Sequence, residues 1–139
     1  MNPLQAIIDV AQLEGDIAVG AGADDADMIQ KKLGVTSKSW CAVNSWIVIE
    51  VEGAPDAAYV PPMVPLVLYG KIVAAGDDDR VRIGDDVFST YAIKHDKGAI
   101  FETPSDVYVL MGAGRRVPVG PKTLKAAQSF VRESTAGDD

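Results

Sequence analysis

Short β-branched and aromatic segments alternate with turn sequences from Pro65 to Arg116, the longest patterned stretch of the chain. Gly-Asp, Asp-Lys-Gly and Gly-Ala-Gly interrupt it at short intervals, a spacing that is typical of consecutive antiparallel strands. An open meander of this length would expose two strand edges to pairing with other chains. We therefore expect a sheet that curls on itself and leaves its turns in solvent.

The individual strands follow from the same pattern. Asn44-Ser45 breaks a β-rich run, which predicts either one long strand with a bulge or a hairpin. The stretch Gly53 to Pro65 is rich in proline and cannot lie in a central strand. Gly112 to Gly114 is expected to form a turn. The predicted strands are Trp40–Val43 with Trp46–Val51, Leu66–Ala74, Val81–Ile83, Val87–Ile93, Ile100–Thr103 and Val107–Met111.

Helical periodicity is confined to the two ends of the chain. Asn2-Pro3 begins an amphipathic segment that ends at Gly15, and 17–23 reads as a loop. Asp24 is expected to cap a second helix that stops at Gly34, and a third helix follows Gly120. The pattern predicts an α+β fold, with a curved antiparallel β-meander or small SH3-like half-barrel. We expect one domain over 1–139, with helical 1–35, β-core 36–119, helix 120–133 and a disordered tail 134–139.

The predicted core draws mainly on the strands, and two pairs of positions sharpen it. Trp40 and Trp46 have the same parity along a continuous strand, so both are expected to point inward. Val109 and Leu110 are adjacent and must face opposite sides, which places one of them under a terminal helix. The expected core includes Trp46, Leu68, Val87, Phe101, Val109 and Leu110.

The net charge of −7, from 20 acidic and 13 basic residues, opposes binding to a phosphate backbone and suits a basic partner. Cys41 is the single cysteine, so no intramolecular disulfide can form, and a reducing, cytoplasmic compartment is expected. The apolar runs are too short to span a bilayer, and the N-terminus lacks the features of a secretory signal. We expect no membrane association.

Several blocks of sequence together resemble an uncharacterised domain-of-unknown-function family of short bacterial, prophage-associated proteins. The resemblance covers roughly Asp24 to Pro118. Because the family has no assigned activity, it implies an accessory role without a mechanism. The blocks that carry the resemblance are SWCAV, WIVIEV, RIGDDVFST, FET and VYVLMGAGRR.

The candidate catalytic and metal-binding residues each have a simpler structural reading. His95, the single histidine, is expected at a hairpin tip, which offers a general base neither a partner nor a pocket. Cys41 is expected to be a buried small hydrophobe. Asp77, Asp78 and Asp79 lack the alternating spacing of a Ca²⁺ loop and read as a solvated turn. We therefore predict no catalytic residue, no cofactor and no metal.

Arg115 and Arg116 follow a glycine-rich turn and are costly to bury unpaired, so they face water or a ligand. Alternatively, one of them pairs with Asp85 or Glu102. The predicted binding surface joins the two turns and consists of Gly84, Asp85, Asp86, Gly112, Gly114, Arg115 and Arg116.

Three classes of function remain open from the sequence. The favoured class is a non-enzymatic accessory factor that binds another protein, such as an inhibitor or immunity-type protein of a prophage or mobile element. A nucleic-acid-binding small β-barrel is disfavoured by the net charge of −7. A small enzyme would show a deep polar pocket that brings His95, Glu102 or Asp85 together. We expect a monomer or a homodimer.

Overall fold

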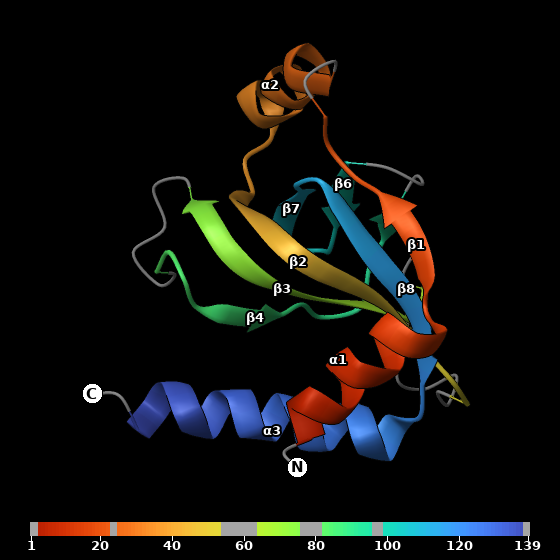
Figure 1. Ribbon diagram of the computed structural model, residues 1–139. Coiled ribbons are helices and arrows are strands. Elements are labelled where there is room, and N and C mark those ends of the chain that lie inside the picture. Colours follow the sequence, from red (N-terminus) through yellow and green to blue (C-terminus); the bar gives the residue numbers. More distant parts are fainter. Residues whose placement is uncertain (1–2, 23–24, 54–63, 76–81, 96–98, 138–139) are drawn as a thin grey trace.

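A computed structural model describes residues 3–22, 25–53, 64–75, 82–95 and 99–137 of the chain. These residues form three helices and one curled sheet, so the predicted α+β half-barrel is confirmed (Figure 1). The helices are α1 (Pro3–Glu14), α2 (Ala26–Val35) and α3 (Pro121–Gly137). The strands are β1 (Asp16–Val19), β2 (Ser39–Val51), β3 (Leu66–Ala75), β4 (Asp86–Phe88), β5 (Lys94–His95), β6 (Ile100–Glu102), β7 (Asp106–Leu110) and β8 (Ala113–Val119).

The long strand β2 organises the sheet. One of its edges pairs with the antiparallel β3, and the other edge pairs first with β7 and then with β8, both parallel to β2. The prediction of a purely antiparallel meander is therefore wrong at these two pairings. Parallel neighbours need a crossover, and here the segment from β3 to β6 supplies it and returns the chain in the direction of β2. The remaining strands extend the sheet to β1 on one side and β5 on the other.

A bulge divides β2 into two halves that face different ways. Asn44 lies opposite Lys71 and Ile47 lies opposite Tyr69, so two residues of β2 occupy the space of Gly70 on β3. Ser45 adopts a φ of 48° there. The bulge confirms the one-strand alternative, but it also reverses the alternation of side chains.

The two tryptophans consequently lie in different hydrophobic clusters. Trp46 belongs to the cluster that fills the inside of the curl, whereas Trp40 packs on the outer face with residues of α2. The prediction that both point inward is wrong, because equal parity holds only along a strand without a bulge.

Trp46 belongs to the interior cluster, and glycines on the two neighbouring strands make room for it and for Val43. Gly114 on β8 lies directly under the indole, and any Cβ at this position would overlap the ring. A Cβ at Gly70 would lie only 2.8 Å from Cβ of Val43. Ala18, opposite Gly114 on β1, also packs in this cluster. The two glycines are therefore required by packing.

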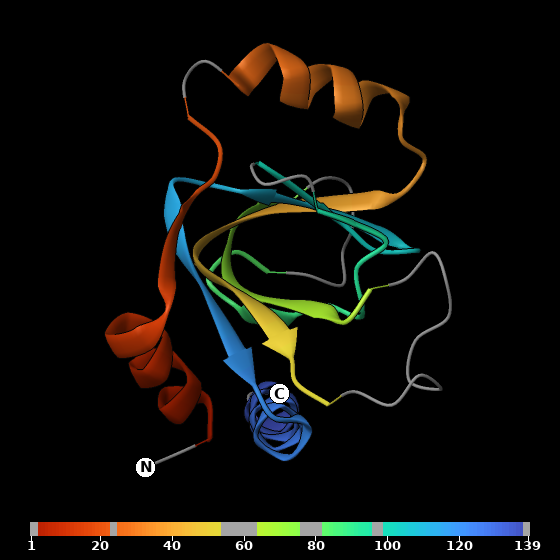
Figure 2. The same cartoon turned by 90° about the vertical axis from the view of Figure 1, so that its right-hand side faces the viewer.

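The helices cover two separate parts of the outer face of the sheet (Figures 1 and 2). α1 and α3 pack together on the second half of β2 and on β8, around Ile49 and Val117. α2 packs at the opposite end, where Ile29 and Leu33 contact the cluster of Val109. Val109 therefore lies under a terminal helix while Leu110 is inside, as predicted. The other expected core residues are buried except Val87, which is half-buried.

Local predictions failed mainly where the sequence is rich in small residues. The predicted loop 17–23 contains β1, and the predicted turn after Gly112 is already β8, with only Gly112 at a positive φ. Residues 82–83 and 89–91 are not strand, and β5 begins at Lys94. α3 continues to Gly137, so the predicted tail is wrong for 134–137. Asp24, the aspartates 77–79, the turn 96–98 and most of the proline-rich stretch lie outside the described residues.

Gly114→Ala is expected to destabilise the fold, because the added methyl group must displace the buried Trp46 ring. Overpacking of this kind costs about 1–3 kcal/mol. Chemical denaturation followed by circular dichroism measures the loss. Gly34→Ala in α2 is the matched control, since its Cβ meets open space and alanine favours a helix. Equal stability of the Gly114→Ala variant and the wild type would contradict the packing described here.

Candidate functional site

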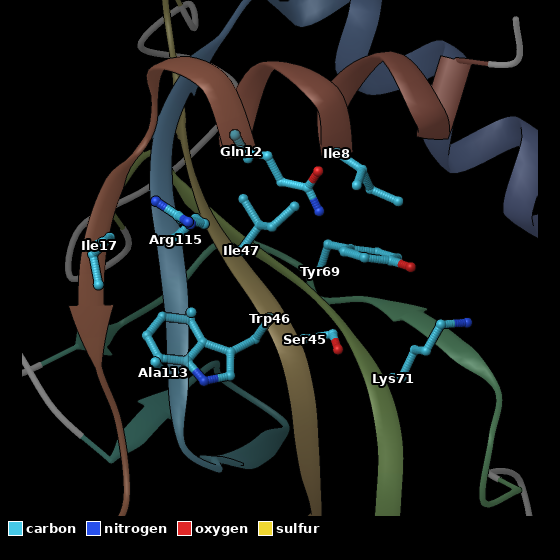
Figure 3. A pocket seen from close by; sticks show the side chains of 12 residues that line it. Ile8, Gln12, Ile17, Ser45, Trp46, Ile47, Tyr69, Lys71, Ala113 and Arg115 are labelled. Atoms are coloured by element: carbon cyan, nitrogen blue, oxygen red, sulfur yellow. The ribbon is translucent and has the colours of Figure 1, made fainter.

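An open groove of about 700 Å³ lies on the outer face of the sheet, beside α1. Its floor is formed by one row of residues that are paired across adjacent strands and therefore share a face of the sheet. In order from β1 to β3, the row consists of Ile17, Arg115, Ile47 and Tyr69. Ile8, Ala11 and Gln12 of α1 form the wall above it (Figure 3).

The groove lies between the two places where helices pack on the outer face. α1 and α3 pack over Ile49 and reach Ile47 and Tyr69 at the edge of the groove, and α2 packs around Ala42. Between them lies the β2 bulge, where Asn44 and Ser45 are exposed. Ser45 and Ile47 border the groove from below. The uncovered strip is thus a direct consequence of where the helices dock.

Arg115 is the dominant charge at the end of the groove near β1. Its side chain is half-buried, and Figure 3 shows it beside Ile47, with Gln12 and Ile17 as its labelled neighbours. Among the described residues, none forms an ion pair or a hydrogen bond with this guanidinium. A guanidinium presents a rigid fork of donors that matches a carboxylate. Arg115 is therefore placed to bind an acidic group that enters the groove.

Charges at the opposite end of the groove compensate one another. Asp86 accepts a hydrogen bond from the Tyr69 hydroxyl at 2.7 Å and forms an ion pair with Lys71 Nζ at 3.0 Å. Burial, and then the bond to Asp86, raises the pKa of Tyr69 far above its ordinary value. Tyr69 therefore stays a neutral donor, and the charge of Lys71 is balanced by Asp86.

The predicted binding surface is not one continuous patch. Arg115 and Gly114 border the groove, and Asp86 holds two residues that line it, Tyr69 and Lys71. Arg116 points to the other face, where Nε donates to Glu50 Oε1 at 3.2 Å. Neighbouring residues of a strand face opposite sides, so the two arginines separate as soon as this segment is a strand.

The two turns of the predicted surface are placed as follows. Gly84 has a φ of 97° and Gly112 a φ of 69°. Near the first turn, the Asp85 carbonyl accepts a hydrogen bond from the Ile72 N–H. Neither Gly84, Asp85 nor Gly112 borders the groove.

The chain matches the model of a family described as "Domain of unknown function (DUF6957)" over residues 19–126. The match covers well over half of the chain, in agreement with the resemblance seen in the sequence. The chain belongs to this family. No curated protein and no solved structure matches the chain.

The DUF6957 match divides the groove into two parts. Arg115, Tyr69 and Lys71 lie within the matched residues, as does the β2 bulge. The wall from α1 and Ile17 of β1 precede residue 19 and lie outside the match. The floor from β8 to β3 and its charges thus lie within the match, whereas Ile17 and the wall from α1 lie outside it.

A second cavity, of about 470 Å³, opens on the inner face between the two edge strands. Residues of β1 border it on one side and His95 of β5 on the other, with Trp46, Val48 and Arg116 between them. His95 is therefore not at an exposed hairpin tip as predicted. Its ring packs against Phe101, with 5.5 Å between centroids.

The remaining residues considered as catalytic or metal-binding candidates are placed as follows. Cys41 is buried in the interior cluster, as predicted. In the described part of the chain, no three His, Cys, Asp or Glu side chains come together as a metal site. No helix there has the length and the hydropathy that a membrane crossing requires. Among the described residues, Glu102 and His95 border two different cavities, and Asp85 borders neither of these.

Glu102 is a buried carboxylate that fixes α2 to the sheet. It accepts hydrogen bonds from Nζ of Lys32 in α2 at 2.7 Å and from Nζ of Lys38 at 2.5 Å. Lys38 also donates to the Thr103 carbonyl at 2.9 Å. Hydrogen bonds from Lys32 and then Lys38 hold the pKa of Glu102 below its ordinary value. The alternative in which Arg115 or Arg116 pairs with Glu102 is therefore not found among the described residues, where Arg116 pairs with Glu50.

The stability that Glu102 contributes is expected to vanish in acid. Because its pKa is lower in the folded chain, the ionised carboxylate favours folding above its ordinary pKa of about 4.3, and the contribution is lost as the pH falls further. Glu102→Gln should lower the melting temperature at neutral pH and flatten its fall in acid. Glu52→Gln, at an exposed position, controls for the loss of one charge. If the melting temperatures of the wild type and of Glu102→Gln fell equally steeply in acid, this role of Glu102 would be contradicted.

Proposed function

We propose that the protein acts by binding another protein, and that a segment of this partner occupies the outer groove with an acidic group on Arg115. The observation that carries the proposal is a half-buried guanidinium, unpaired among the described residues, at the end of a groove lined by apolar and polar side chains. Charged hydrogen bonds to a carboxylate are among the strongest that a protein surface can offer. An acidic residue of the partner would supply the missing acceptor.

The surroundings of the groove favour a macromolecular partner over a small metabolite. Ile17 is 70% exposed, Val19 74% and Leu13 85%, so the apolar surface continues past the groove over β1 and the end of α1. Extended exposed apolar surface is typical of interaction sites. Arginine next to buried aromatic or aliphatic residues is also a frequent centre of binding energy in interfaces.

The charge of the whole molecule adds a second requirement. With a net charge of −7, the protein attracts a partner that is basic overall and accelerates its approach. Arg115 then selects a local carboxylate within that partner. A basic protein with one acidic residue in its contact segment fits both requirements. An inhibitor or immunity-type role for this binding stays a prediction.

Arg115→Ala is expected to leave the fold intact and to weaken partner capture, because the guanidinium has no partner to lose among the described residues. A tagged protein is used to capture partners from a lysate of the source cells, and the captured protein is then titrated against each variant. Loss of a charged hydrogen bond corresponds to roughly 1.5–3 kcal/mol, or about ten- to a hundredfold in affinity. Arg115→Lys should recover only part of it.

Arg116→Ala is the matched control, since it removes the neighbouring arginine from the inner face. It breaks the ion pair with Glu50, so a change in melting temperature is expected, while affinity for the captured partner stays close to that of the wild type. Equal binding by wild type and Arg115→Ala would overturn the proposed role of the groove. Salt should weaken wild-type binding more than binding by Arg115→Ala.

A further inference from the structure

The strand β1 has one edge at which no described residue pairs with it. Among the described residues it pairs with β8 alone and stands at one end of the strand order, and Figure 1 shows it at the margin of the sheet. Proteins usually guard such edges with charged residues, proline, a bulge or a very short strand. β1 is short and carries one charge, Asp16 at its first position, but it has no lysine, proline or bulge, and Ile17 and Val19 are both largely exposed.

The hydrogen-bond pattern shows which groups of β1 face outward. Gly20 N–H donates to the Gly112 carbonyl at 2.8 Å, next to the ladder between β1 and β8. Bonded pairs alternate in an antiparallel ladder, so Ala18 with Gly114 is a bonded pair and Ile17 with Arg115 is not. The Val119 carbonyl accepts a hydrogen bond from the Glu52 N–H, just past the end of β2. The backbone N–H and C=O groups of odd-numbered β8 residues therefore point toward β2, and those of even-numbered residues point toward β1. Ile17 and Val19 therefore present their N–H and C=O groups at the free edge.

The space beside this edge is a gap in the half-barrel. The 470 Å³ cavity begins at β1 and ends at His95 of β5, the other edge strand. Trp46 forms part of its lining, and the indole N–H is buried without an acceptor among the described residues. An unsatisfied buried donor is unfavourable. The gap thus offers both an open strand edge and a donor that lacks its acceptor.

We infer that β1 is a strand-addition site, at which an extended segment of the partner protein pairs with Ile17 and Val19 and fills the gap between β1 and β5. Backbone hydrogen bonds would supply the affinity, as in other cases of strand addition. One inward side chain with an oxygen acceptor would reach the Trp46 indole. Outward side chains would lie beside Ile17, next to Arg115 on the same face. The inference rests on the proposed function and states how the partner is held.

A selection of short random peptides, displayed on phage, against the full chain supplies a defined probe. With a selected peptide bound, hydrogen exchange at the amides of Ile17 and Val19 should slow. Ile17→Pro removes one free-edge donor but no bond to β8, so the fold should persist while affinity falls by about tenfold or more. Ile17→Thr keeps the N–H and the branched side chain and should bind nearly as the wild type does.

Two further variants keep the test decisive. Val19→Pro blocks the same edge at the second position and replaces Ile17→Pro if that variant fails to fold. Trp40→Phe leaves Trp46 as the single tryptophan, so a shift of its fluorescence on peptide binding reports on the gap. Peptides that bind both proline variants as tightly as the wild type would overturn the inference, as would a selection that yields no binder.

The same variants separate this inference from the proposed function. If capture of the natural partner requires Arg115 but tolerates both proline variants, the groove is used and strand addition is wrong. If capture requires the edge and is indifferent to Arg115→Ala, the groove proposal fails instead. If the wild type forms a dimer that Ile17→Pro converts to a monomer, the edge is occupied by a second copy, and the inference of a partner segment is overturned.

Discussion

The packing of Trp46 on Gly114 is the contact on which the rest of this structure depends. It joins β2 to β8 at the point where β8 takes over from β7 along the same edge of β2. A side chain at position 114 would push β8 away from the indole and open the curl. Interiors pack at crystal-like density, so the glycine cannot be replaced without movement of the strands around it.

The β2 bulge gives this contact its direction and also shapes the outer surface. By shifting the alternation at Ser45, it turns Trp46 inward and Ile47 outward. The first half of β2 can then support α2 while the second half supports α1 and α3. The ion pair of Glu102 with Lys32 holds α2 to the sheet, and the ion pair with Lys38 fixes the segment between α2 and β2. The uncovered strip between the helices becomes the groove.

The groove and the gap beside β1 are neighbours that share Ile17 and Trp46. A strand of the sheet separates them, with its side chains alternating between the two. A partner that occupies both would therefore contact side chains on the outer face and backbone N–H and C=O groups at the β1 edge. The family match covers the floor of the groove from β8 to β3 but not Ile17 or the wall from α1.

The sequence by itself determined the fold class, the helical ends, the core position of Phe101 and the opposite facing of Val109 and Leu110, because these follow from local periodicity. Only the tertiary structure decided the parallel pairing of β2 with β7 and β8, the strand β1, and the separation of Arg115 from Arg116. These depend on which strands meet, and no local pattern encodes that. In AGRR, the glycine that resembles a turn signal is the space that Trp46 occupies, and this becomes visible only when a residue 68 positions earlier in the chain is placed beside it.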